Sequence, residues 1–118
     1  MKKIIFYSYS KCSTCTKASK WLNQKGLQYK LIDIVKETPS IKYLNLALDQ
    51  YELDKKKLFN TRGKLFRSMA LDISNLSNKE IIQLLSSNGK LIKRPFLVNG
   101  LEKIILGFNE KEYSESLA

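Results

Sequence analysis

The sequence predicts an α/β fold with a mixed sheet of about four strands, in the order βαβ, helical insertion, ββα. A β-type run at residues 3–9 precedes a helical pattern from Ser13 to Gln24, and a second β-type run follows at Leu27–Ile34. A βαβ unit of this kind aligns its strands in parallel. Two later β-type runs flank Asn99-Gly100, a pair that suits a tight antiparallel hairpin. The chain has 118 residues, so we expect one domain over 1–118.

The first helix is predicted from Ala18, Trp21 and Leu22, which fall at helical spacing, and Gly26 is expected to end it. The helical insertion is placed at about 40–88. Pro39-Ser40 opens its first helix, whose apolar residues recur with a period close to 3.6.

Shorter amphipathic segments follow in the insertion at 55–59, 62–69 and 77–85. In the last of these, Ser77 stands three residues before Glu80, the spacing of a capping box. Gly89 is expected to end that helix. Strands at 95–98 and 103–106 and a short helix at 109–117 complete the prediction.

Composition restricts the class of protein. Hydrophobic residues make up 43% of the chain and the formal charge is +10, with 21 Lys and Arg against 11 Asp and Glu. This balance is typical of a folded protein with a basic surface that attracts anionic partners. No apolar run is long enough to span a bilayer, and the N-terminus is too polar for a signal peptide, so we expect a cytoplasmic protein without membrane contacts. Without arginine clusters or a nucleic-acid motif, sequence-specific DNA binding is not expected.

Cys12 and Cys15 are the two cysteines of the chain, spaced as Cys-Ser-Thr-Cys at the predicted strand-to-helix turn. Free backbone N–H groups and the helix dipole at such a turn favour a thiolate, which is the nucleophilic form. A second cysteine three residues later can resolve a mixed disulfide by closing an internal one. We therefore predict that Cys12 attacks and that Cys15 resolves.

Two other interpretations of the cysteine pair are weaker. A structural zinc ion needs about four ligands, and the chain has no His and no further Cys, so no metal site is expected. Two inert, buried thiols are a second alternative. The position at a helix start beside Ser and Lys favours redox chemistry over inert packing.

Residues near the cysteines are candidates for binding an anionic substrate. Lys11 could stabilise the thiolate, and Ser13 and Thr14 would add hydroxyl donors at the helix start, although they could equally be simple caps. Arg94-Pro95 opens a late strand, where the proline either marks a sheet edge or adopts a cis bond. If Pro95 packs beside Cys12, Arg94 could reach the substrate or the thiolate; otherwise Arg94 is a surface residue.

Three stretches of the sequence resemble the ArsC and Spx/MgsR family, and the likeness covers essentially the whole chain. They are Phe6–Leu22 (FYSYSKCSTCTKASKWL), Leu91–Val98 (LIKRPFLV) and Leu106–Glu110 (LGFNE). The resemblance implies a thioredoxin-like fold with a helical insertion, a nucleophilic cysteine at Cys12 and a cis proline at Pro95. It is strongest to the CxxC-containing ArsC-like members of unassigned activity.

The resemblance also separates the possible functions. Arsenate reductases of this family carry two further arginines, and the corresponding positions here fall near Asn60 and Phe108, so arsenate reduction is disfavoured. The Spx-like regulators, which bind RNA polymerase, share the CxxC and a Thr-Arg-Ser segment. Thr61-Arg62 resembles that segment with Gly63 in place of the serine, which makes Arg62 a candidate binding residue.

The leading hypothesis is a thiol-disulfide oxidoreductase or thiol-dependent reductase in which Arg94 orients the substrate or steadies the thiolate. It requires no bound cofactor, and glutathione or a dithiol protein would be the external reductant. The alternative is an Spx-like redox-sensing regulator that binds RNA polymerase.

Overall fold

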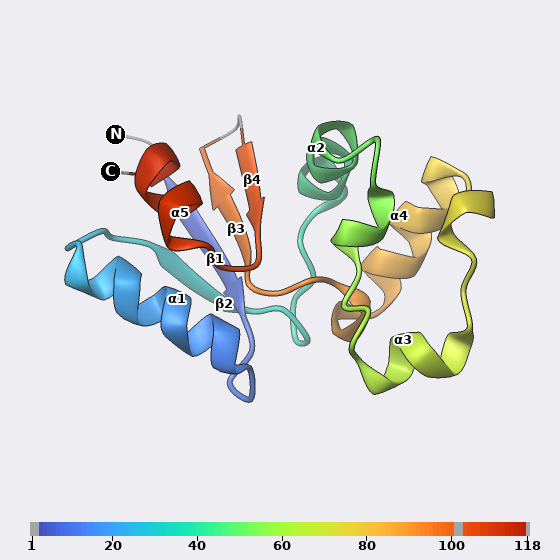
Figure 1. Cartoon of the computed structure of the whole chain (residues 1–118), viewed down its shortest axis with the longest axis horizontal. Coiled ribbons are helices and arrows are strands. Elements are labelled where there is room, and N and C mark those ends of the chain that lie inside the picture. Colours follow the sequence, from blue (N-terminus) through green and yellow to red (C-terminus); the bar gives the residue numbers. More distant parts are fainter. Residues whose placement is uncertain (1–2, 101–102, 118) are drawn as a thin grey trace.

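A four-stranded mixed sheet with the strand order β2-β1-β3-β4 organises the fold (Figure 1). The computed structural model describes residues 3–100 and 103–117. Strand β1 pairs in parallel with β2 and antiparallel with β3, and β3 pairs antiparallel with β4. The predicted α/β class with a mixed, thioredoxin-like sheet is confirmed. The strands span β1 Ile4–Ser8, β2 Lys30–Asp33, β3 Phe96–Asn99 and β4 Lys103–Leu106.

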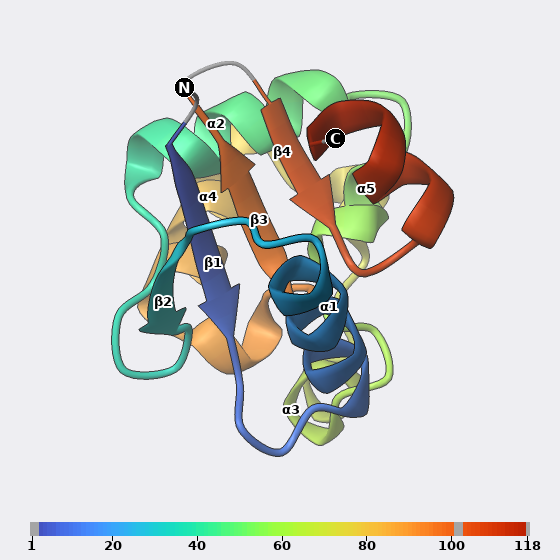
Figure 2. The same cartoon turned by 90° about the vertical axis from the view of Figure 1, so that its left-hand side faces the viewer.

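Helices α1 (Ser13–Gln24) and α5 (Glu110–Leu117) cover one face of this sheet, as Figure 2 shows with both helices in front of the strands. Side chains alternate between the two faces of a strand, and one set of buried residues packs beneath these helices. Trp21 of α1 meets Tyr113 of α5 edge to face, with the ring centroids 5.5 Å apart. The strand residues of this cluster are Ile4, Phe6, Leu97 and Ile105.

The opposite face of the sheet shares one hydrophobic core with the helices that lie between β2 and β3 in the chain. These are α2 (Ile41–Gln50), α3 (Lys64–Met69) and α4 (Asn78–Ser87), with short 3₁₀ helices η1 Lys55–Leu58, η2 Ile73–Asn75 and η3 Gly89–Leu91. The sheet therefore has a core on both faces. The buried strand residues on this side are Tyr7, Phe96, Val98 and Ile104, and the helices contribute Leu44, Leu48, Ile81 and Leu85.

The outer edge of β4 is covered by a side chain instead of a fifth strand. Gln50, the last residue of α2, accepts from the Ile104 N–H at 2.7 Å and donates to the Ile104 carbonyl at 2.9 Å. The carboxamide makes the two hydrogen bonds that a neighbouring strand would make, so this stretch of edge is unavailable for pairing with another chain.

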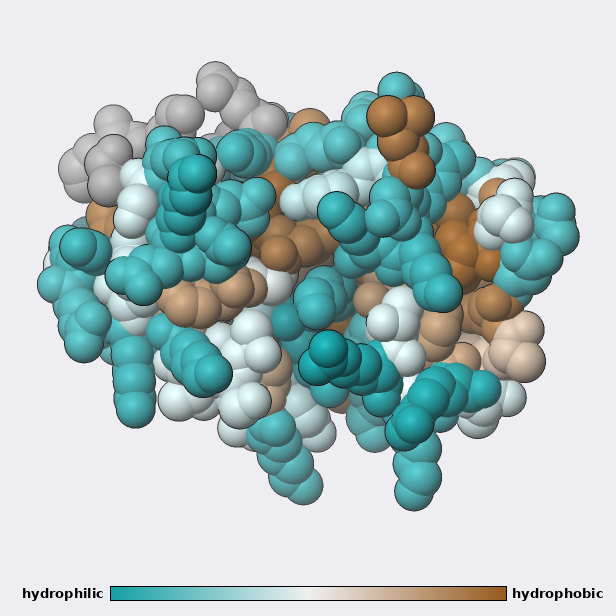
Figure 3. Space-filling model, viewed as in Figure 1, coloured by the Kyte–Doolittle hydropathy of each residue, from teal (hydrophilic) through white to brown (hydrophobic). Residues whose placement is uncertain are grey.

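Hydrophilic side chains cover most of the face seen in Figure 3, and hydrophobic ones form smaller, separate patches. No helix in the described parts of the chain is both long enough and apolar enough to cross a bilayer.

Local sequence signals explain most of the helix ends. The capping box is present, since Glu80 donates its N–H to the Ser77 hydroxyl and its carboxylate accepts from the Ser77 N–H. Gly26 follows the end of α1 with φ +67°, and the Leu27 N–H donates to the Leu22 carbonyl in a Schellman arrangement.

Two predicted turns differ from the structure. Gly89 is the first residue of η3 and does not end α4. A glycine is needed here because the backbone lies close to Ile34, and an added Cβ would be 1.9 Å from the Ile34 carbonyl oxygen. Asn99 stays in β3, opposite Lys103, where its buried amide donates to the Ser116 carbonyl. The predicted hairpin turn extends into residues 101–102, outside the described residues.

The two glycines provide a test of this packing. We expect Gly89→Ala to lower the free energy of unfolding by about 3 kcal/mol, because the methyl group overlaps backbone atoms that cannot move independently. Gly26→Ala is the matched control: nothing lies within 4 Å of its added Cβ, so only the left-handed backbone is penalised, by about 1 kcal/mol. Denaturant unfolding measures both, and equal losses would contradict the close approach at Gly89.

Candidate functional site

Cys12 lies at the end of the turn between β1 and α1 and is the N-cap residue of the helix. The turn closes where the Cys12 N–H donates to the Tyr9 carbonyl at 3.1 Å. The Cys12 Sγ then accepts from the Cys15 N–H at 3.2 Å, which satisfies one of the free donors of the first helical turn. The sulfur therefore lies against a backbone donor at the N-terminus of the helix.

Cys15 differs from Cys12 in being almost completely buried, with 2% of its surface exposed. Both cysteines are free thiols, and Cys12 is partly exposed. Burial, followed by a hydrogen bond with the Cys12 thiol, raises the pKa of Cys15 to about 11, although hydrogen bonds from the Tyr9 backbone and the Ser8 hydroxyl act in the opposite direction. Near neutral pH Cys15 is consequently a protonated thiol beside an accessible one.

Strand pairing brings Arg94 to the Cys12 turn. The register of β1 with β3 places Tyr7 opposite Phe96, and its continuation past the strand ends places Tyr9 opposite Arg94. The Arg94 guanidinium accordingly lies over the Tyr9 ring, 4.8 Å from its centroid. The Arg94-Pro95 bond is cis, the arrangement that the family resemblance implied, and Pro95 is buried at the start of a central strand instead of marking an edge.

Arg94 retains unused hydrogen-bonding capacity. Its Nη1 atom is buried and has no hydrogen-bond partner within the described residues. A guanidinium is always charged and carries several donors, so an unpaired buried nitrogen favours an anionic ligand at this place.

Tyr9 and Arg94 line a hollow of about 610 Å³, here called the Arg94 hollow. Three of its lining residues are cationic, none of the described ones is acidic, and the exposed wall is mainly apolar. The hollow is therefore suited to an anionic ligand with an apolar portion. Its other lining residues are Asn60, Gly63, Lys64, Leu65, Ser68, Asn88 and Lys90.

Two segments from the helical region are tied together to form the far wall of the Arg94 hollow. The Asn60 N–H donates to the Leu91 carbonyl at 2.8 Å, and the Lys93 N–H donates to the Leu58 carbonyl at 2.9 Å. The Asn60 amide also donates to the Lys90 carbonyl at 3.4 Å. A Cβ at Gly63 would lie 2.6 Å from the Asn60 amide nitrogen, so a side chain at this position would disturb that bridge.

The structure brings together only part of the predicted binding set. Lys11 and Ser13 are exposed and Thr14 is half-buried, all in the turn and first helical residues around Cys12. Arg62 is exposed and does not line the Arg94 hollow. Phe108 packs against Tyr113 with the ring centroids 4.8 Å apart.

Sequence reasoning missed Asn60, Lys64 and Lys90, which belong to the hollow. Spacing along the chain could not join residues 60–64 to residues 88–94, because their contact depends on how the helical region folds back. One signal was present: neither 55–71 nor 81–101 contains an acidic residue.

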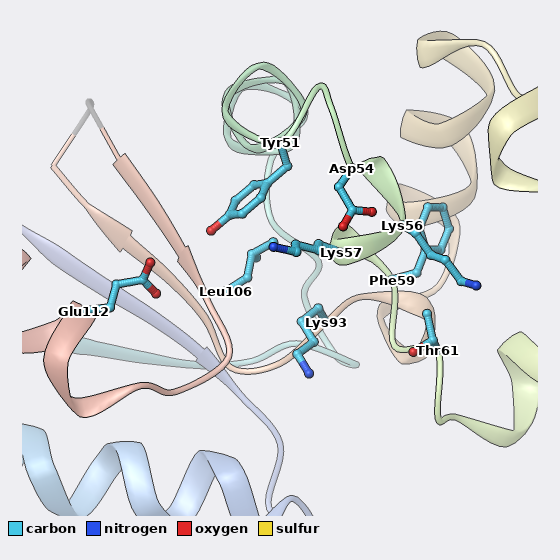
Figure 4. Close-up of a pocket in the computed structure, with 9 residues that line it drawn as sticks. All are labelled: Tyr51, Asp54, Lys56, Lys57, Phe59, Thr61, Lys93, Leu106 and Glu112. Carbon is cyan, nitrogen blue, oxygen red and sulfur yellow. The ribbon is translucent and has the colours of Figure 1, made fainter.

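A second hollow, of about 470 Å³, lies between β4 and η1 (Figure 4). In Figure 4 Lys57 reaches toward Tyr51 and Leu106, with the carboxylates of Asp54 and Glu112 on either side. Its mixed charge, with Asp54 and Glu112 beside the lysines, makes it a weaker candidate for an anionic ligand. Within residues 3–100 and 103–117, no cluster of three or more His, Cys, Asp or Glu side chains could hold a metal ion.

Known proteins are similar to this chain in both sequence and fold. The sequence model of the ArsC family matches residues 7–116. The protein YusI of Bacillus subtilis is 40% identical over 117 residues, covering 98% of both chains. The regulatory protein MgsR of the same organism is 31% identical over 114 residues, covering 94% of this chain and 87% of MgsR. The crystal structure of a possible arsenate reductase from Streptococcus mutans superposes with a TM-score of 0.87 at 35% identity, covering 97% and 99% of the two chains. The chain therefore belongs to the ArsC family.

Proposed function

We propose that the protein is a thiol-disulfide oxidoreductase in which Cys12 is the nucleophile and Cys15 the resolving thiol. The observation that carries this proposal is the contrast between the two sulfurs: Cys12 Sγ is partly exposed and accepts a helix N–H, whereas Cys15 is buried and protonated directly behind it. A nucleophile must be accessible and a resolving thiol must be close and shielded.

The proposed cycle balances as a two-electron exchange. The Cys12 thiolate attacks one sulfur of a substrate disulfide, forms a mixed disulfide and releases the first thiolate. Cys15 then loses its proton to solvent and attacks the Cys12 sulfur, which releases the second thiolate and leaves an internal disulfide. The substrate has gained two electrons from the cysteine pair. Two external thiols, from glutathione or a dithiol protein, return the pair to the reduced state without a bound cofactor.

Arg94 is proposed to orient the substrate. The Arg94 guanidinium packs on the Tyr9 ring, and the backbone carbonyl of the same Tyr9 accepts the hydrogen bond that closes the Cys12 turn. Tyr9 thereby links the position of the guanidinium to that of the Cys12 sulfur. Arsenate reduction is less well supported, since the two further arginines of the family's arsenate reductases fall near Asn60 and Phe108 in this sequence, although Arg62 is close to the first. A cytoplasmic location, as expected from the sequence, would supply reducing thiols.

A redox-sensing regulator is the second candidate, favoured by the likeness to MgsR. In that case closure of the Cys12–Cys15 disulfide would change affinity for a protein partner, RNA polymerase being the partner that the Spx resemblance suggests. The same cysteine chemistry serves both candidates, and the difference lies in whether turnover or binding follows it.

Single cysteine substitutions test the proposed roles. With a neutral aromatic disulfide as substrate, Cys12→Ser should abolish mixed-disulfide formation, because the buried Cys15 cannot reach the reagent at neutral pH. Cys15→Ser should form the mixed disulfide and retain it. Intact-protein mass spectrometry detects both states. Mixed-disulfide formation on Cys15 in the Cys12→Ser variant would contradict the assignment of Cys12 as the nucleophile.

The raised pKa of Cys15 predicts the pH dependence of the resolving step. Between pH 7 and pH 9 the thiolate fraction of a group with a pKa near 11 grows roughly tenfold per pH unit, so internal closure should accelerate by the same factor. Burial, the largest cause of the shift, persists when Cys12 is modified. Release of the second thiol after rapid mixing measures this rate, with Cys15→Ser as the control without release. A flat profile would show that Cys15 is not the group that titrates.

Pull-down experiments separate the two candidates. If the protein is an oxidoreductase, it should turn over disulfides with a thiol reductant and bind RNA polymerase equally weakly in its reduced and oxidised forms. Oxidation-dependent copurification with RNA polymerase, absent in Cys12→Ser, would instead favour the regulator.

A further inference from the structure

The Arg94 hollow gathers its charge from parts of the chain that contain no acidic residue. No Asp or Glu occurs in residues 1–32, 55–71 or 81–101. These three stretches supply every residue that lines the hollow, from Tyr9 to Arg94. Acidic side chains occur instead in other segments, such as α5, which begins at Glu110. The positive potential of the hollow is therefore not neutralised by its own walls.

Two lysines in this hollow come from the helical region, separate in the chain from Arg94 and the cysteines. Lys64 is the first residue of α3, and Lys90 lies in η3. Hydrogen bonds of Asn60 link the two segments: its backbone carbonyl accepts from the Gly63 N–H at 3.0 Å, and its side-chain amide donates to the Lys90 carbonyl. The Asn88 side chain also accepts from the Lys90 N–H at 2.9 Å. Both lysines thus start from fixed backbone positions.

An apolar portion accompanies the three cations. Tyr9 and Leu65 contribute to a wall whose exposed surface is mainly apolar. Because the Tyr9 ring is already stacked against Arg94, its position is fixed on the cysteine side of the hollow. A ligand that fills this space would place apolar atoms on the wall and negative groups near the cations.

We propose that Lys64 and Lys90 determine substrate specificity, and that the disulfide attacked by Cys12 is a small molecule carrying carboxylates on both halves. Arg94 binds the negative group nearer the reacting sulfur, and Lys64 and Lys90 bind the one farther away. This inference rests on the proposed oxidoreductase function. The second hollow is a poorer site for such a ligand, since Asp54 and Glu112 line it.

Electrostatics explain why such a substrate needs these lysines. A thiolate and an anionic disulfide repel each other, and the product of the attack is a further anion, the released thiolate. Cations in the Arg94 hollow attract the anionic reagent, which raises its local concentration and offsets part of this repulsion. The bonds that form and break are those of the proposed cycle, so no additional reactant is required.

The test compares three disulfides of different charge in the Cys15→Ser background, where only the first step occurs. Dithiobis(nitrobenzoate) is a dianion, dithiodipyridine is neutral and cystamine is a dication. In the Lys64→Gln/Lys90→Gln variant we expect the second-order rate with the dianion to fall about tenfold, the neutral rate to stay within about twofold, and the dication rate to rise. The control variant Lys42→Gln/Lys111→Gln removes the same charge from exposed lysines on α2 and α5 and should keep the dianion rate near the parent value.

Each outcome separates the specificity from the underlying function. An equal decrease in both variants would mean that only net charge matters, and an unchanged dianion rate would remove the lysines from the site; either result overturns the inference. If the neutral disulfide fails to modify Cys12 even in the parent protein, the proposed function itself fails. Thermal unfolding of each variant confirms that it is folded.

Discussion

The antiparallel pairing of β1 with β3 is the constraint on which the site depends. The register of this pair continues beyond both strands and places Tyr9 opposite Arg94. Two residues that are 85 positions apart in the chain are thereby in contact. The Tyr9 carbonyl closes the Cys12 turn, and the Tyr9 ring holds the Arg94 guanidinium. A shift of this register by one residue would exchange the buried and exposed faces of both strands and separate the cysteine turn from the arginine.

The second requirement is a difference between two identical side chains three residues apart. Cys12 precedes the helix and faces its free N–H groups, whereas Cys15 begins the buried face of α1 that continues through Ala18 and Leu22. Cys12 is the N-cap residue and has an extended backbone, with φ −108° and ψ 113°, so its side chain does not lie on the buried face of the helix. Cys15 lies within α1 and on that buried face. One short motif thereby supplies an accessible sulfur and a shielded, protonated one. The helical region completes the site by adding a basic wall that the thioredoxin-like sheet does not itself provide.

Much of this arrangement could be predicted from sequence because it is encoded locally. The bounds of α1, the N-cap serines of α2 and α4 and the position of both cysteines follow from capping and periodicity within a few residues. The role of Gly89 could not be predicted from sequence. Only glycine fits at this position because the Ile34 backbone, distant in the chain, occupies the space of a side chain. Lys64 and Lys90 were missed for the same reason. Arg62 was predicted as a binding residue from the Thr61-Arg62 sequence, but it does not line the Arg94 hollow.

The proposed function requires that Cys12 and Cys15 form a redox-active dithiol. The most direct measurement equilibrates the reduced protein with buffers of known glutathione to glutathione-disulfide ratio and counts protein thiols by alkylation and mass spectrometry. We expect a reversible, two-electron transition to one internal disulfide, with little glutathione left on the protein at equilibrium. Stable glutathione adducts at Cys12, or two thiols that stay reduced in every buffer, would contradict it.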